Sequence, residues 1–314
     1  MAEPSSVATA RVAADPDDAS TRGISAWLER RASFMLPFPA VATVALMLAF
    51  PLGYTLFMSV QEWNVASANP PRFVFLDNYV TLFTTDTRFK NSIFVTFYFT
   101  LLGVTVQTFL GVTLALLFNR QFWGRGILRT LAILPMVATP VAIALIFVMM
   151  FHPTLGVMNY FLTVVGLPPW AWTYSSSTVI PALVIVDTWQ WTPLIMLITL
   201  AGLAALPGEP YEAAMIDGAS KPQMLWLITL PLLRPTIVTA ALFRLIDSLK
   251  TFDIIFVMTQ GGPGGASDTI NIYLFNTAFA YFHMGMASSM VVIFFAIVLG
   301  VSILAVRIRR ATWI

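Results

Sequence analysis

Residues 207–235 read PGEPYEAAMIDGASKPQMLWLITLPLLRP, a polar stretch set between two strongly apolar ones. Pro210 suits the first turn of a helix, and the carboxylates of Glu209 and Glu212 lie where the helix dipole favours negative charge. Gly218 suits the left-handed residue that ends a helix. The stretch therefore predicts a short helix of roughly two turns, placed between two apolar segments.

This short helix has a surface that another molecule can cover. Ala213 and Ala214 are small enough to allow a close approach, while Tyr211 and Met215, four residues apart, share one face. We therefore expect a partner to pack onto the loop.

The composition places the chain in a membrane. Of its 314 residues, 58% are hydrophobic and only 10% are charged, which is too apolar for a soluble domain. Long charge-free runs each supply the roughly 20 apolar residues that a membrane-spanning helix needs. We expect an all-α membrane protein with six spans, at about residues 34–59, 92–118, 131–151, the low 170s to 206, 235–258 and 284–306. The chain has no cysteine and two histidines, so we expect no metal site.

Basic residues indicate the orientation. If both termini are cytoplasmic, twelve Lys and Arg residues outside the spans face the cytoplasm, and only Arg72, Arg88 and Lys90 face outward. This bias obeys the positive-inside rule and puts residues 207–235 in the cytoplasm. Residues 1–31 are rich in Ala, Ser, Asp and Arg, and we expect a disordered cytoplasmic tail there, not a signal peptide.

Two of the expected spans carry polar stripes. Arg244, Asp247, Ser248 and Thr251 are spaced to share one helix face, and so are Asp187, Gln190 and Trp191 in the span before the loop. A carboxylate, an amide and an indole suit a carbohydrate, which offers hydroxyl groups and apolar C–H faces. The alternative is structural: Arg244 pairs with Asp247, Lys250 with Asp253, and Asp187 with Arg244 or Lys250.

An enzyme that acts alone is not expected. The glycine-rich stretch Gly261-Gly-Pro-Gly-Gly265 lacks the Lys-Ser/Thr of a phosphate-binding loop, and no nucleophile has a base nearby. Any energy source must therefore be another subunit or an ion gradient.

Three motifs of the loop support a more specific interpretation: Tyr211-Glu-Ala-Ala214, Ile216-Asp-Gly-Ala219 and Ile228-Thr-Leu-Pro231. They resemble the EAA motif of ATP-binding-cassette importer permeases, of the sugar-uptake type related to the maltose and glycerol-phosphate permeases. Thr259-Gln-Gly-Gly-Pro263 is also similar to that family. The resemblance implies a type I importer permease fold, with a six-helix domain over residues 32–314 and a coupling loop at 207–235.

The resemblance also implies a set of partners. In such importers the EAA helix docks on a cytoplasmic ATPase dimer, which binds ATP and Mg²⁺, so this chain would hold no cofactor. A second, homologous permease completes the pore, and a periplasmic or lipid-anchored solute-binding protein delivers the sugar-like substrate. The implied location is the bacterial inner membrane, in contact with lipid, and no nucleic acid partner is expected.

Functional residues are transferred by their positions in the motifs. The implied ATPase-coupling residues are Tyr211, Glu212, Ala213, Ala214, Asp217 and Gly218, with Glu212 as the anchoring carboxylate. In the maltose-type permease, sugar contacts come from the helices on either side of the loop. The positions that look equivalent are Asp187, Gln190, Trp191, Arg244, Asp247, Ser248 and Thr251. Pro222 departs from the family, which often has Trp there.

Several alternatives stay open from sequence. One alternative is a permease of the same family whose solute is an osmolyte, a phosphate or an amino acid instead of a sugar. Outside it, the chain is an ion-coupled secondary transporter that uses the charges near Arg244, or a membrane scaffold or receptor in which these charges only pair helices.

Overall fold

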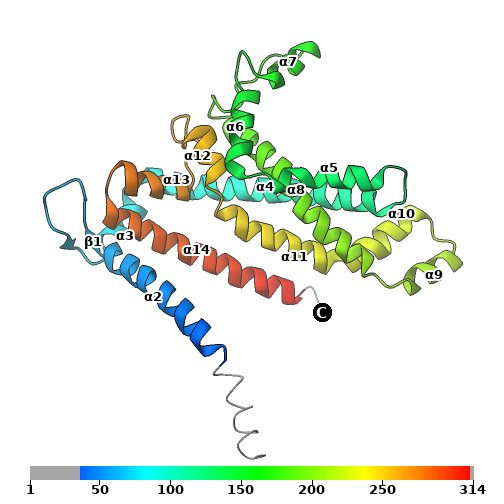
Figure 1. Ribbon diagram of the computed structural model, residues 1–314, viewed down its shortest axis with the longest axis horizontal. Helices are drawn as coiled ribbons and strands as arrows, with labels where there is room; N and C mark the ends of the chain where they lie inside the picture. Colours follow the sequence, from blue (N-terminus) through cyan, green and yellow to red (C-terminus); the bar gives the residue numbers. More distant parts are fainter. Residues whose placement is uncertain (1–35, 312–314) are drawn as a thin grey trace, which may run out of the picture. The chain divides into compact units, whose positions relative to one another are not determined.

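The computed structural model describes residues 36–311, which are mostly helical and include one small antiparallel pair of strands (Figure 1). The expected tail, residues 1–31, lies outside this range. The chain divides into two compact units, residues 1–54 and 55–314. Helix α2 (Phe38–Ser59) begins in the first unit, and its last turn belongs to the second.

Five helical segments of the described part are long and apolar enough to cross a membrane, and a bent pair of helices counts as a sixth span. This finding confirms the expected all-α membrane fold. The single segments are α2, α4 (Thr87–Asn119), α8 (Val179–Ala204), the continuous segment Lys221–Leu249, and α14 (Met284–Ala311). The bent pair is α5 (Arg125–Val137) with α6 (Pro140–Met150).

The centre of the second unit is a three-helix contact among α4, α8 and α11 (Leu230–Leu249). Two glycines allow the close crossings. A Cβ on Gly111 of α4 would lie 2.8 Å from Ile195 of α8, and one on Gly202 of α8 would lie 2.7 Å from Thr236 of α11. Small residues at such crossings let membrane helices approach backbone to backbone.

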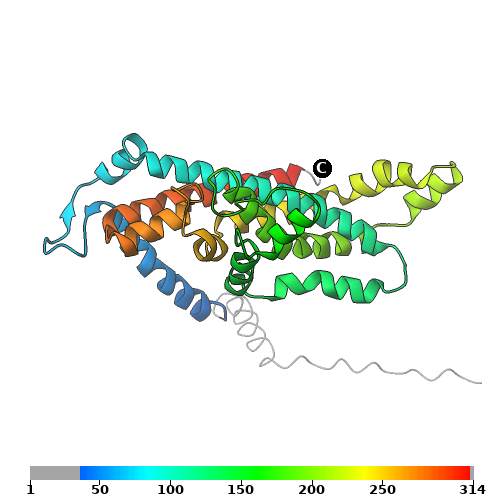
Figure 2. The same cartoon turned by 90° about the horizontal axis from the view of Figure 1, so that it is seen from above.

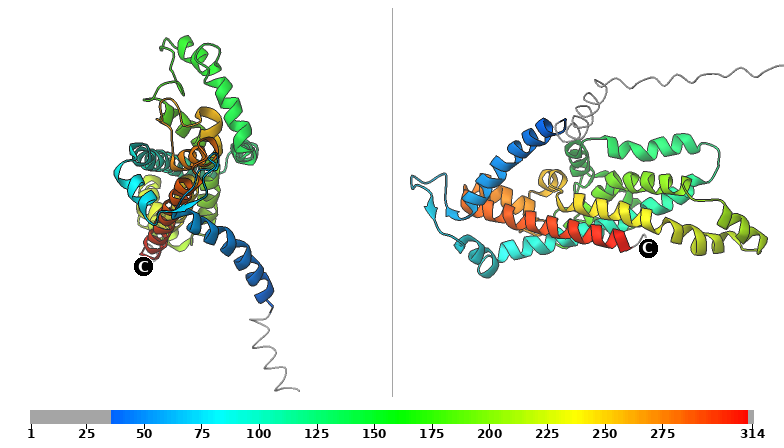
Figure 3. Two further views of the ribbon diagram at one scale, coloured as in Figure 1. Left: turned by 90° about the vertical axis from the view of Figure 1, so that its left-hand side faces the viewer. Right: turned by 90° about the horizontal axis from the view of Figure 1, so that it is seen from below.

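The expected third span is broken. Helices α5 and α6 meet at an angle of 98°, a change of direction that Figure 3 shows. The break falls at Ala138 and Thr139, whose backbones are extended, directly before Pro140. Because proline disfavours helical geometry in the residue before it, the first helix ends there and a second begins at Pro140.

The fifth span is also displaced from the expected 235–258. Helix α10 (Lys221–Met224), the π-helical turn η1 (Leu225–Thr229) and α11 form one segment that ends at Leu249, and Asp253 opens a separate helix, α12 (Asp253–Thr259). Pro231 and Pro235 do not stop the segment, since wider turns can absorb the missing N–H groups in membrane helices.

Most of the remaining elements lie at the two ends of the second unit (Figure 2). Helix α9 (Glu209–Ile216) is at one end, and α13 (Ile270–Phe275), η2 (Asn276–Ala280) and α3 (Asp77–Thr84) are at the other. Strands β1 (Gln61–Glu62) and β2 (Arg72–Phe73) pair beside α3. The short helix α7 (Val157–Val164) follows α6.

Candidate functional site

A fully buried guanidinium lies where α4, α8 and α11 meet. Arg244 of α11 has no exposed side-chain surface, and each of its three nitrogens donates a hydrogen bond. Nη2 donates to Asp187 Oδ2 at 2.6 Å, Nε to Gln107 Oε1 at 2.9 Å, and Nη1 to Asp247 Oδ2 at 3.1 Å. Gln107 Nε2 also donates to Asp187 Oδ2, at 2.7 Å. A buried charge is tolerated only when it is paired in this way, so the cluster fixes the three helices together.

A small cavity of about 220 Å³ adjoins this cluster. Trp191 and Asp247 contribute to its wall, and the Asp247 side chain is 41% exposed. The segment after α11 supplies Lys250, Thr251 and Asp253. The remaining lining residues are Pro140, Phe252 and Ile254. The wall therefore combines an indole ring, carboxylates, an ammonium group and a hydroxyl.

The predicted substrate residues divide into two groups. Trp191, Asp247 and Thr251 line the cavity, although Thr251 does so from beyond the end of α11 and not from the expected helical stripe. The other four are buried and do not line it: Asp187, Gln190, Arg244 and Ser248. Their contact with substrate stays a prediction.

Gln190 and Ser248 lie outside the hydrogen-bonded cluster around Arg244. Gln190 Nε2 donates to the carbonyl of Ala138 at 3.2 Å, so this amide holds the break between α5 and α6. The oxygens Gln190 Oε1, Ser248 Oγ and Asp187 Oδ1 are buried without a hydrogen-bond partner in the described part of the chain.

The expected ion-pair ladder forms only in part. Arg244 pairs with Asp247 and with Asp187, which confirms the structural alternative for these three residues. Lys250 and Asp253 make no ion pair in residues 36–311, because the helix ends between them and both side chains are exposed.

Helix α9 forms as the 207–235 stretch predicts. Pro210 lies in its first turn, and Gly218 follows it with φ +76°. The Gly218 N–H donates to Met215 O at 3.2 Å and the Ala219 N–H to Ala214 O at 2.9 Å, which is the paired closure of a Schellman motif. These bonds satisfy the last carbonyls of a helix that has no buried residue.

The surface of α9 is largely uncovered. Tyr211 turns back toward the bundle, with its hydroxyl donating to Thr229 Oγ1 at 3.0 Å. Met215 and Ile216 are 59% and 87% exposed, and Glu212 is exposed without an ion pair among the described residues. The expectation that Tyr211 and Met215 share one uncovered face is therefore met by Met215 and not by Tyr211.

The comparison with family models decides the class of protein. Residues 107–313 match the family described as "Binding-protein-dependent transport system inner membrane component". The chain belongs to this family. The resemblance found in the 207–235 loop is thereby confirmed, and the chain is a transport permease subunit with several apolar helices in the inner membrane.

Relatives align over nearly the whole permease. The trehalose/maltose transport system permease protein of Thermococcus litoralis is 34% identical over 285 residues, which cover 90% of this chain and 95% of that protein. The sulfoquinovosyl glycerol transport system permease protein of Agrobacterium fabrum is 34% identical over 288 residues, which cover 90% and 93%. The trehalose permease protein of Mycobacterium tuberculosis is 32% identical over 286 residues, which cover 90% of each.

The fold of the permease is that of a solved importer. A chain of a bacterial alginate ABC transporter, solved in complex with an alginate pentasaccharide-bound periplasmic protein, superposes with a TM-score of 0.78. The match covers 91% of this chain and 96% of that one at 22% sequence identity. At this identity the similarity establishes the fold alone.

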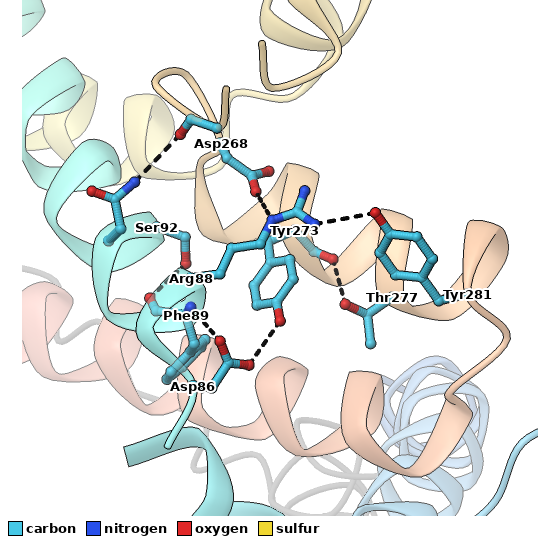
Figure 4. Close-up of polar contacts among 10 residues, drawn as sticks. Asp86, Arg88, Phe89, Ser92, Asp268, Tyr273, Thr277 and Tyr281 are labelled. Carbon is cyan, nitrogen blue, oxygen red and sulfur yellow. Dashed lines mark hydrogen bonds and ion pairs between the residues drawn. The ribbon is translucent and has the colours of Figure 1, made fainter. Parts of the chain in front are cut away.

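The permease also has a polar cluster at the end of the bundle opposite α9, shown in Figure 4. The Arg88 Nε donates to Asp268 Oδ2 at 2.6 Å, and its Nη1 donates to the Tyr281 hydroxyl at 3.1 Å. The guanidinium lies 4.7 Å from the centre of the Tyr273 ring, and the Tyr273 hydroxyl donates to Asp86 at 2.7 Å. The cluster joins the start of α4 to the segment that holds α13 and η2.

Burial alters the acid–base behaviour of two members of this cluster. Burial raises the pKa of Asp268 above its ordinary value, although the adjacent Arg88 acts in the opposite direction. Burial, together with the hydrogen bond to Asp86, raises the pKa of Tyr273.

Sequence reasoning missed Gln107 and the Arg88 cluster. Gln107 had a signal, because it is a lone amide in a long charge-free run and such groups need a partner inside a membrane bundle. The pairing of Arg88 with Asp268 had none, since 180 residues separate the two and no periodicity relates them.

Proposed function

We propose that the chain forms one half of the translocation pathway of an ATP-driven importer for a carbohydrate or sugar derivative. A cytoplasmic ATPase dimer binds ATP and Mg²⁺, and α9 transmits its closure to the membrane helices, which alternate between inward-open and outward-open states. The observation that carries this proposal is α9 itself, a rigidly capped helix with exposed Met215, Ile216 and Glu212 at the end of the bundle.

A carbohydrate is supported by the cavity beside Arg244. Sugars present hydroxyl groups that need acceptors and C–H faces that pack on aromatic rings, and Asp247 and Trp191 supply both. The named relatives of the permease transport trehalose, maltose or sulfoquinovosyl glycerol. Four further residues are proposed to contact the substrate: Asp187, Gln190, Arg244 and Ser248. Because these residues are buried in this structure, the helices must open before the substrate can reach them.

The remaining partners complete the proposed transporter. A second, homologous permease supplies the other half of the pore, and a periplasmic or lipid-anchored solute-binding protein delivers the substrate. Both termini and α9 face the cytoplasm, and this chain carries no cofactor of its own. The match to an alginate transporter solved with its periplasmic protein is consistent with such an assembly.

The coupling proposal is tested by charge reversal on α9. We expect Glu212→Lys to lower substrate-stimulated ATP hydrolysis and uptake by about tenfold or more, because a docking carboxylate is replaced by an unpaired cation. Glu209→Lys is the matched control, since it makes the same charge change in the same turn of the helix and Glu209 is also exposed. We expect it to change the rates by about twofold or less. Equal rates for Glu212→Lys and wild type, in fully assembled complexes, would refute the proposed coupling.

The energy source separates this proposal from a secondary transporter that uses the charges near Arg244. We expect uptake to stop when ATP is depleted and to persist when the ion gradient is dissipated. The reverse pattern would establish ion coupling.

A further inference from the structure

Arg244 is the cation that most resembles an anion-binding residue, yet it is buried and already paired with two carboxylates. Its guanidinium is completely buried, and all three nitrogens already donate to Asp187, Asp247 and Gln107. Two carboxylates against one guanidinium leave this cluster with an excess of negative charge. A carboxylate, sulfonate or phosphate on a substrate would have to displace a 2.6 Å buried ion pair to reach Arg244.

The wall of the adjacent cavity continues this charge balance. Asp253 adds one carboxylate to those of the cluster and Lys250 adds one cation, so the cluster and the wall together hold three carboxylates and two cations among the described residues. Asp247 accepts from Arg244 through Oδ2, and its side chain keeps 41% of its surface exposed. The cavity is therefore rich in hydrogen-bond acceptors and poor in positive charge.

The indole of Trp191 supplies an apolar contact in the same wall. The Arg244 guanidinium lies 5.2 Å from the centre of the ring, so the buried cluster holds the ring in place. The ring also lines the cavity, and its uncovered surface can pack against the C–H face of a sugar.

From this arrangement we infer that this half of the pathway selects a carbohydrate without an anionic group, whose ring packs on Trp191 and whose hydroxyl groups donate to Asp247 and Asp253. The inference rests on the proposed import of a carbohydrate and specifies its chemical class. Hydroxyl donors satisfy the exposed carboxylate oxygens, whereas an anionic sugar meets like charge in a membrane-embedded cavity, where repulsion is weakly screened.

The test measures binding to the assembled transporter without its solute-binding protein, which would otherwise impose its own selectivity. The probes are maltose and trehalose as neutral disaccharides, digalacturonate as an anionic one and the glucosamine disaccharide as a cationic one. We expect a neutral disaccharide to bind at least about tenfold more tightly than digalacturonate, at low and at moderate salt.

Two variants of Lys250 separate the possible roles of the cavity cation. Lys250→Gln removes the charge and Lys250→Arg keeps it. We expect the two variants to differ from each other by no more than about twofold in their affinity for the neutral sugar, because the proposed contacts of this sugar are with Trp191, Asp247 and Asp253. Asp253→Asn removes one carboxylate from the wall. We expect it to reduce the difference in affinity between the neutral disaccharide and digalacturonate.

The outcomes distinguish a failure of the inferred charge selectivity from a failure of the proposed import of carbohydrate. Tighter binding of digalacturonate than of the neutral sugars, lost in Lys250→Gln and kept in Lys250→Arg, would overturn the inference and leave the import of carbohydrate intact. Preference for the glucosamine disaccharide over digalacturonate would support it, because the carboxylates that repel an anion attract a cation. If no carbohydrate binds and a non-sugar solute stimulates ATP hydrolysis, the proposed function itself fails.

Discussion

Arg244 shows how burial decides what a charged residue can do in this permease. Its two carboxylate partners make similar bonds, but Asp187 has no exposed side-chain surface while Asp247 is 41% exposed. The energetic cost of removing each charge should therefore differ, because water can compensate at Asp247 and cannot at Asp187.

We expect Asp187→Asn to lower the stability of the permease by about 3 kcal/mol, because it leaves the buried guanidinium undercompensated. Asp247→Asn is the matched control, and we expect it to cost about 1 kcal/mol or less. The measurement is the thermal unfolding midpoint of the purified complex for both variants. Similar losses at the two positions would show that burial does not govern the pairing.

A second residue-scale prediction concerns pH and Asp268. Burial raises the pKa of Asp268 in the folded state, so protonation of this group favours folding. Its contribution is full below the unfolded pKa of about 3.9 and is lost as the pH rises through the raised folded pKa. We therefore expect the unfolding midpoint of wild type, relative to Asp268→Asn, to rise as the pH falls from about 7 to about 4.5. A relative fall would mean that the attraction of Arg88 outweighs burial.

At the scale of single elements, local sequence was informative wherever a boundary is set by neighbouring residues. Helix α9 could be predicted because Pro210, the early acidic residues and Gly218 all lie within a few positions of its ends. The break before Pro140 was missed because the surrounding residues are uniformly apolar, and hydropathy does not indicate where a helix changes direction. The end of α11 at Leu249 was missed because no Gly or Pro marks it, and this error misplaced Thr251, Lys250 and Asp253.

Spacing and charge made part of the candidate site predictable. Arg244 and Asp247 could be related by their spacing in one helix, and the pairing of Asp187 with Arg244 was one alternative, because charges inside a membrane bundle need partners. The choice of Arg244 over Lys250 and the contact with Gln107 depend on how α4 and α8 cross α11, which no single-helix pattern contains.

The crossing of α4 and α8 gives a prediction for an element. A Cβ at Gly111 would lie 2.8 Å from Ile195 and 3.1 Å from the Met196 backbone nitrogen, so the helices must move apart in Gly111→Ala. We expect a loss of about 1–3 kcal/mol, seen as a lower unfolding midpoint. Gly300→Ala in α14 is the control: nothing lies within 4 Å of its Cβ, and alanine is the better helix former by about 1 kcal/mol. Equal effects at the two glycines would contradict the close crossing.

At the scale of the whole molecule, the permease has the features of an incomplete assembly. Its described helices expose many large apolar side chains, which face lipid or, in the proposed assembly, the second permease. The cavity beside Arg244, about 220 Å³, is smaller than the roughly 300–1,000 Å³ typical of small-molecule sites. A single chain therefore offers one wall of a site and not an enclosed one.

A cavity with one wall per chain predicts that sugar binds the assembled pair of permeases. We expect maltose or trehalose, whichever the transporter takes up, to bind the chain co-purified with a second permease at least about tenfold more tightly than the chain alone. Trp191→Ala in the assembled pair should weaken binding by about five- to thirtyfold, the effect of losing roughly 1–2 kcal/mol of aromatic contact, and leave assembly unchanged. Binding to the isolated chain as tight as to the pair would show that its one wall suffices. An unchanged affinity in Trp191→Ala would instead assign that ring to packing against Arg244.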